Sequence, residues 1–158
     1  IVTAKAAVVM DNDSKVVLFS KNPNLLFSMA STTKIMTALV ALDYFRMDDI
    51  LTIKEENVDG VNVGFKKGQR FTFENILYGM LLPSGNDAAL TLAQNYKEGE
   101  QAFVERMNEK ARKLNLYNTN FADPAGLEDR KDYTTALDLA HLSSFAIKNK
   151  IFAKIVAT

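Results

Sequence analysis

The chain contains no cysteine and no tryptophan, and it has a single histidine, His141. Without cysteine it cannot form a disulfide, a thiol nucleophile or a zinc–thiolate site. One histidine without an H-E-x-x-H pattern does not supply the usual ligands of a catalytic zinc ion, and the phosphate-binding pattern G-x-x-x-x-G-K-[ST] is also missing. We therefore expect neither a metal nor another cofactor.

An excess of charge of either sign is also missing, because 19 basic residues balance 19 acidic ones. This balance removes any bulk attraction to nucleic acid or to an anionic membrane, so no nucleic-acid partner is expected. The apolar runs are far too short to span a bilayer. The start at Ile1 shows no charged segment followed by an apolar one, which is compatible with a signal peptide that has already been removed.

What the chain does have is the composition of a globular protein, with 158 residues, 47% apolar and 24% charged. This length is typical of one domain with a real core. No repeat or linker divides it, so residues 1–158 are expected to form a single domain. The sequence alone does not fix the cellular compartment.

The most informative stretch is Ser31-Thr32-Thr33-Lys34, which precedes the apolar run 35–42. Residues three apart on a helix have Cβ atoms roughly 5–6 Å apart, so the amine of Lys34 can reach the hydroxyl of Ser31. A helix with almost no polar face lies inside a core, where desolvation lowers the pKa of a lysine. A neutral amine can take a proton from a serine. Ser31 is therefore a candidate nucleophile, and Lys34 is its candidate base.

A second polar motif, Ser84-Gly85-Asn86, lies between two expected helices. A serine placed there can pass a proton to a leaving amine, and an asparagine can orient both a substrate amide and the base. The simpler alternative is that Ser84 or Asn86 caps the helix that follows Pro83.

The remaining pattern predicts a mostly helical chain. Residues 4–10 and 16–19 are rich in β-formers and flank turn residues, which indicates a β-hairpin. The Ser31 helix is expected to start after a Ser28 cap and to end near Phe45. Residues 46–72 read as a glycine-punctuated loop with room for short strands. Further helices are expected over 73–82 after Thr72, over 87–96, around the apolar face 103–114, and after a cap at Thr134 or Thr135, before a short apolar segment at 151–156.

Two rival sites are weaker. A Ser-His-Asp triad would need His141, with Asp138 on the same helix, but no G-x-S-x-G elbow presents a serine. The spacing of Asp11 and Asp13 is like that of a calcium loop, but Lys15 stands where the third ligand belongs. A structural histidine and a surface turn are the favoured interpretations.

Three runs, 30–38, 77–89 and 119–127, resemble the D-alanyl-D-alanine carboxypeptidases, the serine-type low-molecular-weight penicillin-binding proteins. The third run has Asp123 where asparagine is commoner. The likeness extends over about residues 6–158. It implies an α/β fold of the β-lactamase and transpeptidase type, here mostly helical with an N-terminal β-hairpin because the C-terminal strands are absent.

The resemblance also implies a mechanism. Ser31 would attack the penultimate D-Ala of a peptidoglycan pentapeptide with Lys34 as general base, and Ser84 would relay the proton to the leaving D-Ala. Asn86 and Gly85 would bind the substrate. β-Lactam antibiotics would acylate Ser31, with its backbone N–H as half of the oxyanion hole. Such a cell-wall enzyme, which affects cell shape, works outside the cytoplasm, in the periplasm or at the cell surface.

One family motif, Lys-Thr-Gly or Lys-Ser-Gly, has no counterpart. The nearest text, Lys66-Lys67-Gly68, precedes the Ser84 motif instead of following it. We therefore expect a truncated N-terminal part of such an enzyme, which self-associates or swaps strands through an incomplete sheet. A D,D-endopeptidase on the same scaffold and a catalytically silent fragment or interaction module remain alternatives. A class A β-lactamase is disfavoured, because it would favour Ser-Asp-Asn and needs a deacylating Glu loop.

Overall fold

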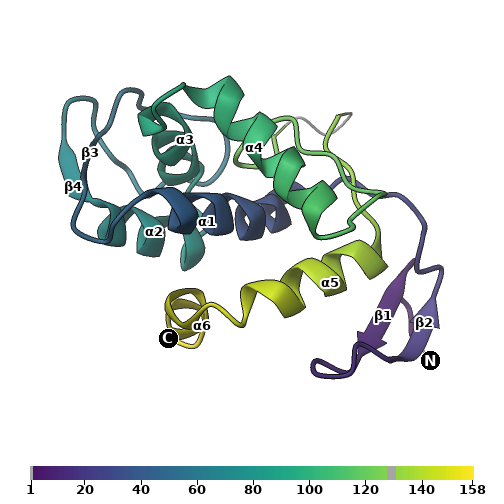
Figure 1. Cartoon of the computed structure of the whole chain (residues 1–158). Coiled ribbons are helices and arrows are strands. Elements are labelled where there is room, and N and C mark those ends of the chain that lie inside the picture. Colours follow the sequence, from purple (N-terminus) through teal and green to yellow (C-terminus); the bar gives the residue numbers. More distant parts are fainter. Residues whose placement is uncertain (1, 128–130) are drawn as a thin grey trace.

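The computed structural model describes residues 2–127 and 131–158, and one helix, α1 (Thr33–Tyr44), lies at its centre (Figure 1). Helices α2, α3, α4 and α5 all contact α1. The sequence explains this position, because nearly every turn of α1 offers an apolar side chain on more than one face. The other helical elements are η1 (Ala30–Thr32), α2 (Phe73–Leu81), α3 (Asn86–Asn95), α4 (Glu100–Lys113), α5 (Ala136–Ala146) and α6 (Lys150–Val156).

The expected N-terminal hairpin is confirmed. Strands β1 (Ala7–Met10) and β2 (Val17–Lys21) pair antiparallel, and β1 packs against α5. Within the turn, Asp11 Oδ1 accepts hydrogen bonds from Ser14 N at 2.7 Å and from Ser14 Oγ at 2.6 Å. Asp11 thus closes the turn in the manner typical of aspartate.

Short strands also form within residues 46–72, as the glycine-punctuated pattern allowed. Strands β3 (Ile50–Thr52) and β4 (Arg70–Thr72) pair antiparallel at the end of the molecule away from the hairpin (Figure 1). The segment Lys66-Lys67-Gly68 lies in the connection just before β4, where Gly68 N donates to Ile53 O at 2.9 Å. This segment forms a turn, which agrees with the expectation that it is not the Lys-Thr-Gly motif of the family.

The helix starts were predicted well except for the first. Thr72 caps α2 by accepting from Asn75 N, and Thr135 caps α5 by accepting from Asp138 N. The predicted Ser28 cap is wrong, because the N-cap residue of η1 is Met29 and that of α1 is Thr32. Ala30, the first residue of η1, has a φ of +45°, so the chain turns sharply there before α1 begins.

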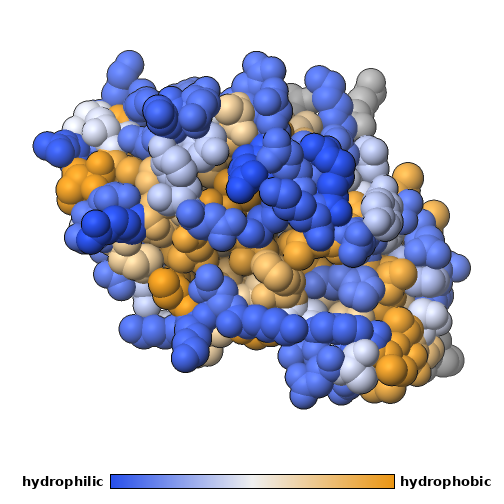
Figure 2. Space-filling model, in the orientation of Figure 1, coloured by the Kyte–Doolittle hydropathy of each residue, from blue (hydrophilic) through white to orange (hydrophobic). Residues whose placement is uncertain are grey.

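Helix α4 has one hydrophilic face and one apolar face, as the expected apolar face over 103–114 implies. Figure 2 shows hydrophilic residues over α4 and apolar residues gathered over the hairpin. The apolar side of α4 is buried at Phe103, Met107 and Ala111.

In the part of the chain that the structure describes, no helix is long and apolar enough to cross a membrane.

Candidate active site

The site forms where η1 passes into α1. Ser31 lies in η1 with an exposed side chain, and Lys34 lies in the first turn of α1 with 3% of its surface exposed. Lys34 Nζ is 3.0 Å from Ser31 Oγ. The predicted contact between the two residues is therefore present, with the hydroxyl open to solvent and the amine beneath it.

Three further oxygens surround the amine of Lys34. Asn86 Oδ1 lies at 2.6 Å, the Ala125 carbonyl at 3.3 Å and Ser84 Oγ at 3.4 Å from Nζ. An ammonium group has three N–H donors, so with Ser31 it serves four acceptors. Lys34 is thus the residue that joins the Ser31 motif, the Ser84–Asn86 motif and the loop at residue 125.

The burial of Lys34 changes its acidity in the predicted direction. Burial lowers the pKa of Lys34 from 10.5 to about 8, because the charged form loses hydration, and the negative charge of Asp123 offsets part of this effect. With such a pKa, about a tenth of the amine is neutral at pH 7. A neutral amine 3.0 Å from a serine hydroxyl can accept its proton.

The turn that holds Ser84 is tightly built. Ser84 has a φ of +64°, an uncommon conformation for a residue with a side chain, and such strain is often found at functional sites. At Gly85, an added Cβ would lie 2.5 Å from Val63 Cγ2 and 2.8 Å from the Gly79 carbonyl oxygen. The motif therefore needs glycine at position 85 for close packing.

Asn86 is fixed at both ends of its side-chain amide. Oδ1 accepts from Lys34, and Nδ2 donates to the Asp59 carbonyl at 2.6 Å. The simpler alternative, in which Ser84 or Asn86 caps α3, is wrong. The N-cap of α3 is Gly85, which makes no side-chain capping bond, and Asn86 is already the first residue of the helix.

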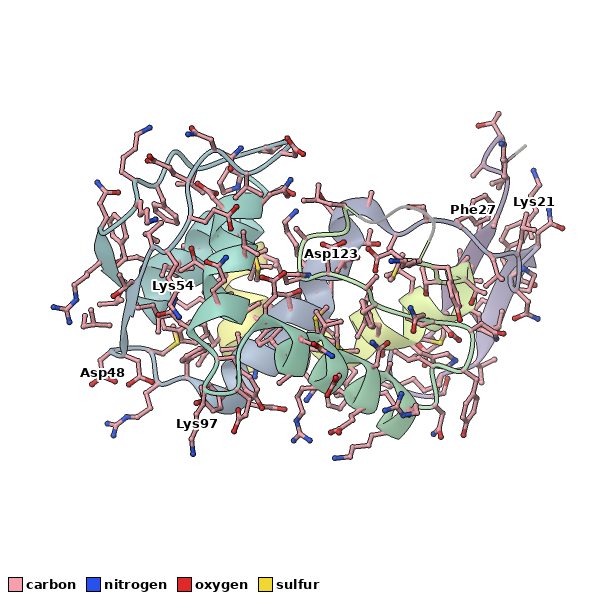
Figure 3. All side chains as sticks on the ribbon, turned by 90° about the horizontal axis from the view of Figure 1, so that it is seen from above. Lys21, Phe27, Asp48, Lys54, Lys97 and Asp123 are labelled. Atoms are coloured by element: carbon pink, nitrogen blue, oxygen red, sulfur yellow. The ribbon has the colours of Figure 1, made fainter. Side chains whose placement is uncertain are left out.

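Sequence reasoning missed the contribution of the loop 123–127, which entered only as part of a run that resembles the family. Its Ala125 carbonyl contacts Lys34, and Thr37 Oγ1 donates to the Pro124 carbonyl at 2.6 Å. Figure 3 places Asp123 beside the start of α1. The run Asp-Pro-Ala-Gly was visible as a turn signal, but nothing local indicated that it meets a lysine some 90 residues earlier in the sequence.

The rival triad has no support in the geometry. Asp138 Oδ2 accepts from Asn118 N at 2.9 Å and from Thr119 Oγ1 at 2.8 Å, so its carboxylate holds the chain before α5. His141 lies further along the same helix and is partly buried. Among the described residues, no group of three or more acidic, histidine or cysteine side chains is arranged to hold a metal ion.

Comparison with known proteins decides the family. Residues 1–157 match the model of the peptidase S11 family, described as D-alanyl-D-alanine carboxypeptidase. The chain belongs to this family. Peptidase S11 membership confirms the resemblance that the three sequence runs indicated.

Individual peptidase S11 relatives agree. The chain is 33% identical to the D-alanyl-D-alanine carboxypeptidase DacF of Bacillus subtilis, over 98% of this chain and 42% of that protein. It is 39% identical to a D-alanyl-D-alanine endopeptidase of Pseudomonas aeruginosa, over 87% of this chain and 45% of that protein. The chain thus spans somewhat less than half the length of these two relatives.

The fold agrees as well. The crystal structure of a D-alanyl-D-alanine carboxypeptidase from Mycobacterium tuberculosis matches with a TM-score of 0.93 and 36% identity, covering 98% of this chain and 60% of that one. The expected fold class is therefore confirmed: a mostly helical part of a D,D-peptidase fold with an N-terminal hairpin.

Proposed function

We propose that this chain is the serine- and lysine-bearing part of a serine-type D-Ala-D-Ala carboxypeptidase. The observation that supports this most directly is the Ser31–Lys34 pair, with 3.0 Å between Oγ and Nζ and a lysine pKa of about 8. Family membership supplies the reaction class. A cavity of about 450 Å³ beside Ser31 and Ser84 gives an acyl group room next to both hydroxyls.

The proposed reaction proceeds through an acyl-enzyme. Ser31 Oγ attacks the carbonyl carbon of the penultimate D-Ala in a peptidoglycan pentapeptide, and neutral Lys34 takes the hydroxyl proton. The C–N bond then breaks, and the proton passes from Lys34 through Ser84 to the departing amine of the terminal D-Ala. Water hydrolyses the ester and regenerates Ser31. The 3.4 Å between Lys34 Nζ and Ser84 Oγ supports this relay.

Asn86 and Gly85 are the proposed substrate-binding residues. Asn86 Nδ2 has two N–H groups, of which one is given to the Asp59 carbonyl, so the other can donate to a substrate carbonyl. The backbone N–H of Ser31 at the start of the helical segment would provide one donor of the oxyanion hole. β-Lactams would enter as substrate analogues and acylate Ser31.

Relatives carry both carboxypeptidase and endopeptidase names, but the family description names the carboxypeptidase activity, so the endopeptidase alternative is not favoured. The peptidoglycan substrate also supports an extracytoplasmic location for the protein. A digest of purified muropeptides distinguishes the two activities, because a carboxypeptidase releases free D-Ala and an endopeptidase separates cross-linked dimers.

The decisive experiment is intact-mass analysis after incubation with a penicillin, followed by peptide mapping. A stoichiometric adduct on Ser31 supports the proposal. Ser31→Ala should abolish it, and Ser28→Ala, three residues earlier on the same segment, should not. If the chain stays unmodified, the same assay is repeated on a form extended to the length of its relatives. Acylation of the extended form would show that the shorter chain is a silent fragment. No acylation of the extended form would show that Ser31 is not the nucleophile.

Self-association through the hairpin is a second part of the proposal. The apolar residues of β2 are unusually exposed, with 67% of Leu18 and 44% of Phe19 accessible. A strand with such a surface invites pairing with another chain. Light scattering over a concentration series tests this, and a monodisperse monomer at all concentrations would contradict it.

A further inference from the structure

The loop 123–127 is held against the start of α1 by contacts that leave it little freedom. A Cβ added at Gly126 would lie 1.9 Å from the Ala30 carbonyl oxygen, directly before Ser31. Thr37 of α1 donates to the Pro124 carbonyl at 2.6 Å. Between these two contacts, the Ala125 carbonyl accepts from Lys34 Nζ at 3.3 Å. The position of that carbonyl therefore depends on the shape of the loop.

The shape of the loop in turn depends on Asp123. Its Oδ1 accepts from the backbone N–H groups of Ala125 and Gly126, both at 2.7 Å, and its Oδ2 accepts from Leu127 N at 2.8 Å. Three backbone N–H groups thus donate to one carboxylate, which holds the loop in the conformation in which the Ala125 carbonyl faces Lys34 of α1. Hydrogen bonds to a charged acceptor are among the stronger ones in proteins.

The same carboxylate places negative charge near Lys34. Two other acidic residues, Asp87 and Glu100, interact with groups other than Lys34. Asp87 accepts from the backbone of Val63, Gly64 and Phe65. Glu100 at the start of α4 has its pKa raised, first by burial and then by the charges of Glu55 and Asp123. The charge of Asp123, in contrast, raises the pKa of Lys34 and so offsets part of the lowering that burial causes.

We propose that Asp123 is a positioning residue for Lys34: it fixes the loop that presents the Ala125 carbonyl to the amine, and its charge stabilises the protonated amine. Its importance for catalysis rests on the proposed function, in which Lys34 is the base. Asp123 then has two opposing effects: it orients Lys34 for proton transfer, and it lowers the fraction of neutral Lys34 at pH 7.

Two substitutions distinguish the two effects of Asp123. Asp123→Asn keeps an oxygen that can accept from Ala125 and Gly126 but removes the charge. Asp123→Ala removes both. Asp13→Asn, in the β1–β2 turn, is the matched control for loss of one carboxylate far from Lys34. The titration of Lys34 is followed by NMR of lysine labelled with ¹³C at Cε, with Lys34→Arg to assign the signal.

We expect Asp123→Asn to lower the titration midpoint of Lys34, because the charge that stabilises the protonated amine is removed, and Asp13→Asn to leave it unchanged. Asp123→Ala should, in addition, speed amide exchange at Ala125, Gly126 and Leu127. An unchanged midpoint in Asp123→Asn would overturn the charge effect. Unchanged amide exchange in Asp123→Ala would overturn the positioning effect.

The pH profile of acylation by a penicillin then connects this inference to the reaction. In Asp123→Asn the profile should move to lower pH by the same amount as the midpoint of Lys34, whereas a purely structural loss would lower the rate at every pH. Because the NMR titration needs no activity, it tests the role of Asp123 independently of the proposed function. A shifted midpoint, together with no acylation of either this chain or its extended form, would reject the proposed function and keep the role of Asp123.

Discussion

Lys34 makes its shortest hydrogen bond with Asn86, at 2.6 Å from Nζ to Oδ1, and not with Ser31, which lies at 3.0 Å. Asn86 is itself anchored through Nδ2 to the Asp59 carbonyl. The amine is therefore held by a fixed amide on α3, whereas the hydroxyl of Ser31 beside it is exposed. If Lys34 is the base of the proposed reaction, Asn86 is the residue that holds it most closely.

The first prediction concerns that amide. Asn86→Asp would place a carboxylate against Lys34, and an opposite charge at this distance raises the pKa of a lysine. We expect acylation by a penicillin at pH 7 to fall by about 10-fold or more, with the pH profile moved upward. Stopped-flow acylation rates between pH 6 and pH 10 (roughly the range around the Lys34 pKa) measure this.

Asn95→Asp is the matched control for the Asn86 substitution. Asn95 lies at the other end of α3, and its side-chain amide bonds the backbone of Thr52. The substitution makes the same chemical change away from Lys34. If both variants moved the pH profile equally, the effect would not come from the contact between Asn86 and Lys34.

The second prediction follows from the lowered pKa of Lys34. Its pKa is about 8 in the folded chain and near 10.5 when unfolded, so between these values the unfolded state binds more protons. The free energy of unfolding should therefore rise with pH from about 8 to about 10.5, relative to Lys34→Met, in which this titration is missing. Below pH 8 and above pH 10.5 the difference between the two proteins should be flat.

Urea unfolding of both proteins across this pH range measures the difference, because the other lysines and tyrosines titrate in both and cancel. Lys34→Met also leaves the acceptors Asn86 and Ala125 without their donor, but that cost does not depend on pH. A difference that stayed constant from pH 7 to pH 11 (roughly the window around both pKa values) would show that Lys34 is not a perturbed lysine.

The sequence predicted the local parts of the site and missed those set by distant contacts. The Ser31–Lys34 contact follows from helix geometry alone, and the burial of α1 follows from its apolar run. The Ala125 carbonyl could not be foreseen, because its approach depends on the Gly126–Ala30 packing across the fold. The Ser28 cap failed because the chain turns at Ala30 with a positive φ, and no glycine at that position indicates such a turn in the sequence.

The third prediction concerns Asp87, which holds the segment 63–65 over the Gly85 turn. Its two carboxylate oxygens accept hydrogen bonds from the backbone N–H groups of Val63, Gly64 and Phe65 at 2.9 to 3.1 Å. Its Oδ1 also accepts from Ala88 N at 2.9 Å. Asn at this position has one acceptor oxygen and places N–H groups against the others. We expect Asp87→Asn to destabilise the chain by about 2–3 kcal/mol.

Amide exchange distinguishes this local mechanism from a general loss of stability. In Asp87→Asn, exchange at residues 63–65 should accelerate more than exchange in the core of α1. Asp43→Asn, which removes a half-exposed ion pair with Lys110, is the control and should cost less than about 1 kcal/mol. Equal acceleration of exchange in α1 and in residues 63–65 would show that Asp87 does not hold this segment locally.

The last prediction separates backbone strain from steric conflict in the loop that contacts Lys34. Gly126 and Gly64 have similar conformations, with φ of +82° and +94°. An added Cβ at Gly126 would lie 1.9 Å from the Ala30 carbonyl oxygen, whereas at Gly64 it would meet nothing within 4 Å. Gly64→Ala should therefore cost only the strain of a positive φ, about 1 kcal/mol.

Gly126→Ala adds a steric clash with the backbone of Ala30, which cannot move out of the way as a flexible side chain could. The loop must therefore move away from α1, and the Ala125 carbonyl moves with it. We expect a loss of more than about 3 kcal/mol, together with a changed titration of Lys34. Urea midpoints of the two variants measure the first effect, and lysine NMR measures the second. Equal destabilisation by both substitutions, with the titration of Lys34 unchanged, would mean that the loop does not need its close contact with Ala30 to hold Lys34.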